Sequence, residues 1–318
     1  MPRLHRLALI RNVEEKFMLI IQRYHKMKAV RWFIFSVGVA CLALARLAAA
    51  EACEGDKLAS PDVATFSSIQ SSAMAGDAQA QAQIGADYLR GKVVQYDPTK
   101  ALAWLNKSAS GGSAEGQYLL GEYYAENGKV DDNFHNAAVW FQKSASQGCI
   151  PATYYLGLLT LHGDGVPKNV ADGNRMVIKA AESGYTLAQL WLGMMLISGD
   201  GIDKNIKDGF IWIKRAADTG DSAAEIFLAS LYLQGKGTNK NPEAGIVLLN
   251  SVITKHDAQS LPAAYSLGTL YMEGKVIPVD KVRALELMIY AANSHYYDSE
   301  KWVKSLTDDL PKQQLVEG

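Results

Sequence analysis

The stretch that decides the fold runs Ala188-Gln-Leu-Trp-Leu-Gly-Met-Met-Leu196, then Gly199-Asp-Gly201, then Trp212-Ile-Lys-Arg-Ala-Ala217 and Gly220. Its first part carries apolar residues at helical spacing, which indicates a helix. Gly199 suits the end of that helix, because glycine adopts the left-handed conformation without steric cost. A polar turn follows, and the segment around Trp212 predicts a second helix that stops at Gly220. The stretch therefore predicts a helix pair.

The pattern recurs along the chain with a period of 36 residues. The first helix repeats a small residue and the second helix a bulky one, at Gly85, Gly121, Gly157 and Gly193, and at Trp104, Trp140, Met176 and Trp212. The series continues at Ala229 and Leu248 and, after three extra residues around 256–260, at Gly268 and Leu287. We expect six units, at 77–112, 113–148, 149–184, 185–220, 221–259 and 260–295. A fixed period of this length is typical of a stacked solenoid, here all-α.

Small residues also stand three positions before each bulky one, where the two helices of a pair should cross in close contact. They are Ala101, Ala137, Gly173, Gly209, Gly245 and Ala284. Because an open array exposes an apolar face at each end, we expect capping helices over 58–75 and 296–310.

The N-terminus predicts export. Lys28 and Arg31 precede an uncharged run, 32–45, and small residues in Ala-x-Ala spacing follow at 48–52. These are the parts of a secretory signal peptide, cleaved after Ala50 or Ala52. The run is shorter than the ~20 residues that span a bilayer. We therefore expect a periplasmic protein of a Gram-negative bacterium, associated with the membrane only if the signal stays uncleaved or is lipidated.

These features divide the chain into five parts. We expect an extended or mis-assigned N-terminus at 1–26 with translation starting at Met27, the signal peptide at 27–52, a tail and capping helix at 53–76, the repeat solenoid at 77–295, and a capping helix and tail at 296–318. Signal cleavage would leave two cysteines, Cys53 and Cys149. In an oxidising compartment such a pair can form a disulfide. The alternative is two unrelated thiols.

Charge and motifs exclude several functions. Residues 1–50 hold nine basic and two acidic side chains, and residues 51–318 hold 23 basic and 31 acidic ones. An acidic body argues against nucleic-acid binding. The chain has no Ser-x-x-Lys, Gly-x-Ser-x-Gly, His-Glu-x-x-His or Cys-x-x-Cys motif, and its histidines stand in different units. We therefore expect no catalytic residues, no cofactor and no metal site.

The repeated motif resembles the Sel1-like repeat family, relatives of tetratricopeptide repeats. The matching residues are Ala188 and Gly193, Gly199-Asp-Gly201, and Trp212 with Ala217 and Gly220. The resemblance implies a right-handed α/α superhelix whose first helices line a concave face. A cysteine-rich branch of the family is similar to penicillin-binding or β-lactamase-type proteins, and its repeated cysteine pairs are absent here.

The family frame also indicates which side chains line the concave face, at fixed offsets from each small residue. Those expected to bind a partner are Tyr118, Glu122, Tyr154, Leu158, Leu161, His162, Leu190, Met194, Ile197, Ile226, Leu233 and Tyr265. A water-facing apolar stripe marks a partner site for a helix or an extended peptide. The alternative is that tight coiling buries these residues as core.

Family members share a scaffold rather than a reaction. The leading expectation is a non-enzymatic, exported protein-interaction scaffold: an adaptor, a regulator of an envelope sensor, or an immunity protein for a secreted effector such as a phospholipase. The alternative is an enzyme acting on cell-wall peptide or β-lactams, and a third possibility is a cytoplasmic scaffold.

Overall fold

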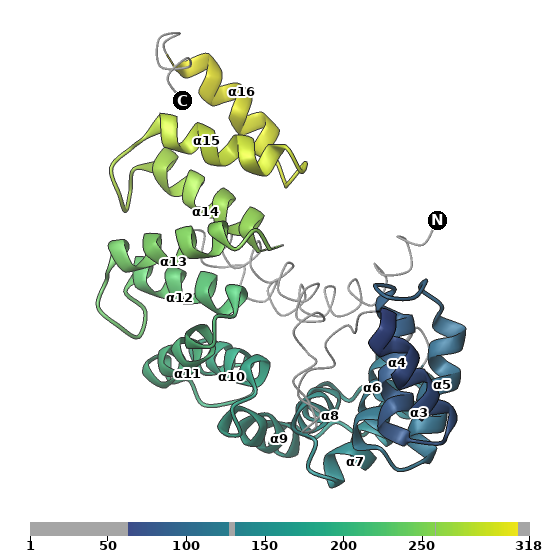
Figure 1. Cartoon of the computed structure of the whole chain (residues 1–318). Helices are drawn as coiled ribbons and strands as arrows, with labels where there is room; N and C mark the ends of the chain where they lie inside the picture. The colour runs from purple at the N-terminus through teal and green to yellow at the C-terminus, as the bar shows by residue number, and fades with distance from the viewer. Residues whose placement is uncertain (1–62, 127–130, 258, 311–318) are drawn as a thin grey trace. The chain divides into compact units, whose positions relative to one another are not determined.

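The computed structural model describes residues 63–126, 131–257 and 259–310, and the predicted signal peptide and Cys53 lie outside these ranges (Figure 1). The described residues form helices and no strand. The helices are α3 Val63–Met74, α4 Ala78–Arg90, α5 Pro98–Ser110, α6 Ala114–Glu126, α7 Asp131–Ser146, α8 Ile150–His162, α9 Val170–Glu182, α10 Thr186–Ser198, α11 Ile206–Asp218, α12 Ser222–Gln234, α13 Pro242–Thr254, α14 Ser260–Glu273, α15 Lys281–Ala292 and α16 Ser299–Asp309.

Each predicted unit is one helix pair, so the expected all-α helical repeat is confirmed. The even-numbered helices from α4 to α14 are the first helices of the pairs, and the odd-numbered ones from α5 to α15 are the second. The described chain forms two compact units, the N-terminal unit at 63–189 and the C-terminal unit at 190–310. No helix in the described part of the chain has the length and apolar character needed to cross a bilayer.

The glycine residues at the helix crossings bring the two helices of a pair into backbone contact. A Cβ atom on Gly193 would lie 2.9 Å from the carbonyl oxygen of Gly209 and 2.6 Å from Ile213 Cδ1. A Cβ atom on Gly209 would in turn lie 2.8 Å from the carbonyl oxygen of Gly193. Gly157 and Gly173 approach each other in the same way, at 3.1 and 2.8 Å. No larger residue fits these crossings.

The turns use the chemistry that the sequence predicts. Most second helices begin at an Asn or Asp whose side chain accepts a hydrogen bond from a backbone N–H of the first turn, as Asn205 does from Asp208. The first helices α4, α8, α12 and α14 end at a glycine in the left-handed conformation, such as Gly163 (φ 81°) and Gly235 (φ 68°). Because these caps satisfy backbone groups that a helix leaves open, they fix the helix ends.

The last helix is shorter than expected. It begins at Ser299 rather than at 296, because Tyr297 adopts a left-handed backbone (φ 56°) that ends the preceding turn. One repeat after Gly268, α16 carries Lys304, an exposed residue where five of the six first helices have glycine. A charged residue suits this place, since Lys304 is exposed to water in the structure. The helix thus caps the array as half of a further repeat.

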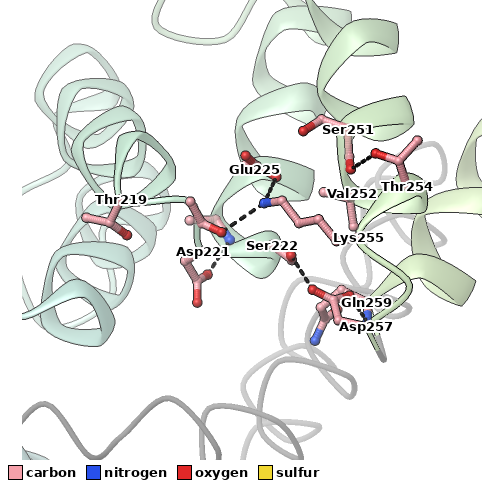
Figure 2. Close-up of polar contacts among 12 residues, drawn as sticks. Thr219, Asp221, Ser222, Glu225, Ser251, Val252, Thr254, Lys255, Asp257 and Gln259 are labelled. Carbon is pink, nitrogen blue, oxygen red and sulfur yellow. Dashed lines mark hydrogen bonds and ion pairs between the residues drawn. The ribbon is translucent and has the colours of Figure 1, made fainter. Parts of the chain in front are cut away.

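A polar bridge joins the end of the fifth repeat to its start and to Gly220, the last residue of the fourth repeat. Lys255 donates from Nζ to the carbonyl oxygen of Gly220 at 2.8 Å and to Glu225 Oε2 at 2.6 Å (Figure 2). Ser222 donates to Asp257 Oδ2 at 2.5 Å, next to the three-residue insertion. These contacts hold the turn that carries the insertion against the start of α12.

Candidate functional site

Seven of the twelve side chains expected on the concave face are buried in the structure. They are Tyr118, Tyr154, Leu161, Leu190, Ile226, Leu233 and Tyr265, each at most 8% exposed. For these residues the expectation of an open stripe is wrong, because they fill the space between helices, as the core alternative holds. Glu122, Leu158, Met194 and Ile197 are half-buried and His162 is exposed. Their role in binding stays a prediction.

In the C-terminal unit, the first-helix positions are largely apolar. Ile226 and Leu233 pack with Leu249 and Val252 of α13, and Met194 and Ile197 lie at the edge of the cluster that holds Ile213. Tyr265 differs from these, because its hydroxyl donates to Asp298 Oδ1 at 2.6 Å and accepts from Trp302 Nε1 at 3.3 Å. It therefore ties the sixth repeat to the capping helix.

In the N-terminal unit, a tyrosine–glutamate cluster forms between α6, α8 and the turn before α10. We define it as Tyr118, Glu122, Tyr154, Tyr155 and Tyr185. The Tyr118 hydroxyl donates to Glu122 Oε1 at 2.6 Å. The rings follow one another, with centroids 6.1 Å apart for Tyr118 and Tyr155, 5.1 Å for Tyr154 and Tyr155, and 5.4 Å for Tyr154 and Tyr185.

Burial keeps the hydroxyls of this cluster neutral. It raises the pKa of Tyr118, Tyr154 and Tyr185, and the negative charge of Glu122 raises the pKa of Tyr118 and Tyr185 further. A hydrogen bond with Tyr155 also raises the pKa of Tyr185. The tyrosines of the cluster are therefore neutral and lie beside one carboxylate.

The residues predicted to bind a partner did not include Tyr155 or Tyr185. A signal for Tyr185 was present, since it stands directly before α10, at the repeat position where Asp77 and Asp221 cap α4 and α12 with their side chains. A tyrosine cannot provide that cap, whose loss typically costs about 1 kcal/mol. A residue that is unfavourable for its own local structure in this way indicates a role elsewhere in the fold.

Cys149 also stands at a helix start without capping it. It precedes α8 at the equivalent position, makes no side-chain capping hydrogen bond and is 1% exposed. Cys41 and Cys53 lie outside the described residues, so the pairing of Cys149 with Cys53 stays a prediction.

The described residues contain no group of three or more His, Cys, Asp or Glu side chains arranged to hold a metal ion. The loops 199–205 and 235–241, which resemble calcium and phosphate loops in composition, connect the helices of their pairs. A cavity in the C-terminal unit has a volume of about 670 Å³ and is lined by Tyr271, Val279, Lys281 and Asp309 among others.

Comparison with known proteins supports the repeat assignment. The Sel1 repeat model matches residues 78–113, 114–149, 150–185, 186–221, 222–251 and 261–296. A Sel1 repeat protein from Oxalobacter formigenes is 25% identical, with 68% of this chain and 85% of that one covered at a TM-score of 0.58. A search of the curated proteins finds no match.

Two further solved structures are similar at lower scores. A protective antigen of uropathogenic Escherichia coli is 22% identical over 79% of this chain and 62% of its own, with a TM-score of 0.41. A Sel1 repeat protein from Klebsiella pneumoniae is 20% identical over 60% of this chain and 93% of its own, with a TM-score of 0.44. With six matched repeats covering more than half of its length, the chain belongs to the Sel1 repeat family.

Proposed function

We propose that this chain is an exported, non-enzymatic scaffold that binds another protein through its first helices. Sel1 repeats are in general scaffolds for protein–protein interaction. Each unit has its own observation that supports this role. In the N-terminal unit, Leu158 is a half-buried apolar side chain on the first helix α8, and the tyrosine–glutamate cluster lies on α6, α8 and the turn before α10; in the C-terminal unit, Met194 and Ile197 are half-buried apolar side chains on the first helix α10. Apolar side chains that keep contact with water beside fixed polar groups are suited to a protein partner.

Export to the periplasm is supported by the sequence of 27–52, with its basic start, apolar run and Ala-x-Ala sites. A disulfide between Cys149 and Cys53 agrees with an oxidising compartment. It would tie the tail of the exported chain to the start of α8. Reducing and non-reducing peptide mapping of the secreted chain tests this pairing.

Three roles fit such a scaffold: a restraint on an envelope sensor, an adaptor in a secretion or polysaccharide machine, and an immunity protein for a secreted effector such as a phospholipase. The identity of the bound protein separates them. The alternative function, an enzyme acting on cell-wall peptide or β-lactams, predicts turnover of these substrates by the purified chain.

The test is a pull-down of the full chain from envelope extract beside the Leu158→Glu/Met194→Glu variant. Both positions are half-buried, so circular dichroism must show an unchanged helix content. The matched control is Val247→Glu, an apolar residue on the second helix α13 that is 67% exposed. We expect one stoichiometric partner that the double variant loses and the control keeps. A partner retained equally by all three would place the contact elsewhere.

A further inference from the structure

We propose that the C-terminal cap carries a saccharide-binding site, at which a neutral pyranose ring stacks on Trp302 and Tyr297 and donates a hydroxyl group to Asp298. The site lies within the C-terminal unit, where α16 packs against α15 (Figure 1). This inference goes beyond the proposed function, because it concerns a small ligand at the end of the array and not the protein bound by the first helices.

The first observation is the exposure of two aromatic rings on the cap. Trp302 is 36% exposed and Tyr297 is 46% exposed, and among the described residues Tyr96 is the one other exposed aromatic side chain. The remaining exposed residues of α16 are all polar, namely Glu300, Lys301, Lys304, Ser305, Thr307, Asp308 and Asp309. Because a terminal cap needs a polar outer face for solubility, an exposed indole there is unfavourable for the fold alone and indicates binding.

The second observation is the backbone of Tyr297. Its φ of 56° lies in the left-handed region, which is unfavourable for a residue with a side chain. Its ring lies against two others, with centroids 5.9 Å from that of Tyr265 and 5.6 Å from that of Tyr296. Strained backbone is typical of binding sites, where it positions a side chain for a ligand.

The third observation is that one buried hydroxyl fixes both Trp302 and Asp298. Tyr265 is 5% exposed, and its hydroxyl donates to Asp298 Oδ1 at 2.6 Å and accepts from Trp302 Nε1 at 3.3 Å. Asp298 and Trp302 stand four residues apart at the start of α16, a spacing that places their side chains on one face. An indole ring and a carboxylate are therefore held side by side before a ligand binds, which lowers the entropic cost of binding.

Asp298 keeps an acceptor for the ligand. Among the described residues, the printed chain offers no donor to its second oxygen, Oδ2, since the Tyr265 hydroxyl bonds to Oδ1. Partial burial and the charge of Asp298 raise the pKa of Tyr297, which agrees with a carboxylate close to that ring. A hydroxyl group that donates to a carboxylate forms a short, charge-assisted hydrogen bond.

The charges around the two rings favour a neutral ligand. Asp298 and Glu300 are acidic, Lys301 is basic and exposed, and the N-terminus of α16 adds a partial positive charge. An anion would meet Asp298, and a cation would meet Lys301 and the start of the helix. A pyranose has a ring face of C–H bonds that packs on an aromatic ring, and hydroxyl groups at its edge that donate and accept hydrogen bonds. It therefore fits both the rings and the mixed charges.

The experiment is binding of the labelled full chain to an array of neutral oligosaccharides built from glucose, galactose, mannose and N-acetylglucosamine. We expect the wild-type chain to bind at least one of them. In titrations with that sugar, Trp302→Ala and Tyr297→Ala should each weaken binding about threefold to tenfold. Asp298→Asn, which keeps an acceptor for Tyr265 and removes the charge, should also weaken it about threefold to tenfold. Tyr297→Phe keeps the ring and should bind within about twofold of wild type.

Two matched controls change the same kinds of side chain away from the cap cluster. Tyr96→Ala removes the other exposed aromatic ring, and Asp308→Asn removes an exposed carboxylate of α16. Both should bind as wild type, and circular dichroism should show the same helix content in every variant. Binding of no sugar, or of a sugar that Trp302→Ala and Tyr297→Ala bind as tightly as wild type, would overturn the saccharide site. The proposed function is judged separately, by the pull-down with Leu158→Glu/Met194→Glu, so either can fail alone.

Discussion

Lys255 and Glu225 form an ion pair with an Nζ–Oε2 distance of 2.6 Å, at the place where the N-terminal unit has two glutamines (Figure 2). Gln147 lies three repeats before Lys255 and donates to the carbonyl oxygen of Gly112 at 3.1 Å and to Gln117 Oε1 at 2.8 Å. Lys255 makes the same two contacts, with Gly220 and with Glu225. The same bridge therefore uses amide hydrogen bonds of Gln147 in the N-terminal unit and the charged side chains of Lys255 and Glu225 in the C-terminal unit.

The equivalence of the two bridges predicts that a second substitution restores the stability lost in a Lys255 variant. Lys255→Ala should lower the free energy of unfolding by about 1–2 kcal/mol, because Glu225 is largely buried and would lose its donor. Lys255→Gln combined with Glu225→Gln recreates the pair of the N-terminal unit and should return to within about 0.5 kcal/mol of wild type. Urea unfolding measures both. A double variant as unstable as Lys255→Ala would show that the two bridges are not equivalent.

Two histidines occupy glycine positions. The turns after α5, α7, α9 and α11 use glycines with φ between 86° and 92°, and the next two turns have His256 and His295 at φ 51° and 53°. A side chain in this left-handed region costs roughly 1 kcal/mol relative to glycine. His256→Gly should therefore stabilise the chain by about 0.5–1 kcal/mol in urea unfolding. His295→Gly should gain less, since His295 also contacts Glu300. His162→Gly, within the end of α8, is the control and should destabilise.

Glu115 makes stability depend on pH. This carboxyl is 3% exposed and accepts a hydrogen bond from Gln79, and burial raises its pKa from 4.5 to about 7. Between these values the folded chain holds a proton that the unfolded chain has lost, so this group's contribution to stability falls as pH rises from 4.5 to 7. Glu115→Gln should remove that fall and gain about 1–3 kcal/mol at pH 8, relative to wild type.

Thermal unfolding from pH 4 to pH 8 measures the difference between Glu115→Gln and wild type. Exposed Glu182→Gln is the control and should leave the pH profile unchanged. A constant difference across this range would mean that Glu115 titrates as an ordinary glutamate.

The recurring Trp-x-x-Lys/Arg motif places a cation over an indole ring. The distances to the ring centroid are 4.3 Å for Lys107 and Trp104, 4.0 Å for Lys143 and Trp140, and 4.5 Å for Arg215 and Trp212. Lys107→Gln, Lys143→Gln and Arg215→Gln should each cost about 0.5–1 kcal/mol in urea unfolding. Lys179→Gln is the matched control, because Met176 stands where the other repeats have tryptophan, and it should have no effect.

The repeat period predicted the helix pairs, because the same turn chemistry and small residues recur at each crossing. Gly193 and Gly209 were identifiable as a contact from spacing alone. The burial of Tyr118 and Ile226 could not be predicted from spacing, because a fixed offset along a helix does not show how far the next repeat covers that side chain. The missing cap at Tyr185 was visible in the sequence, but its neighbours were not, because the rings of α8 contact it only in the folded chain. The late start of α16 depends on the strained backbone of Tyr297.

The most direct test of the central claim is photo-crosslinking in living cells, with benzoylphenylalanine placed at His162, an exposed residue of a first helix, and separately at Val247 on the second helix α13. We predict one specific crosslinked protein from His162, lost in the Leu158→Glu/Met194→Glu background, and none from Val247. A specific partner captured from Val247 and not from His162 would contradict binding through the first helices.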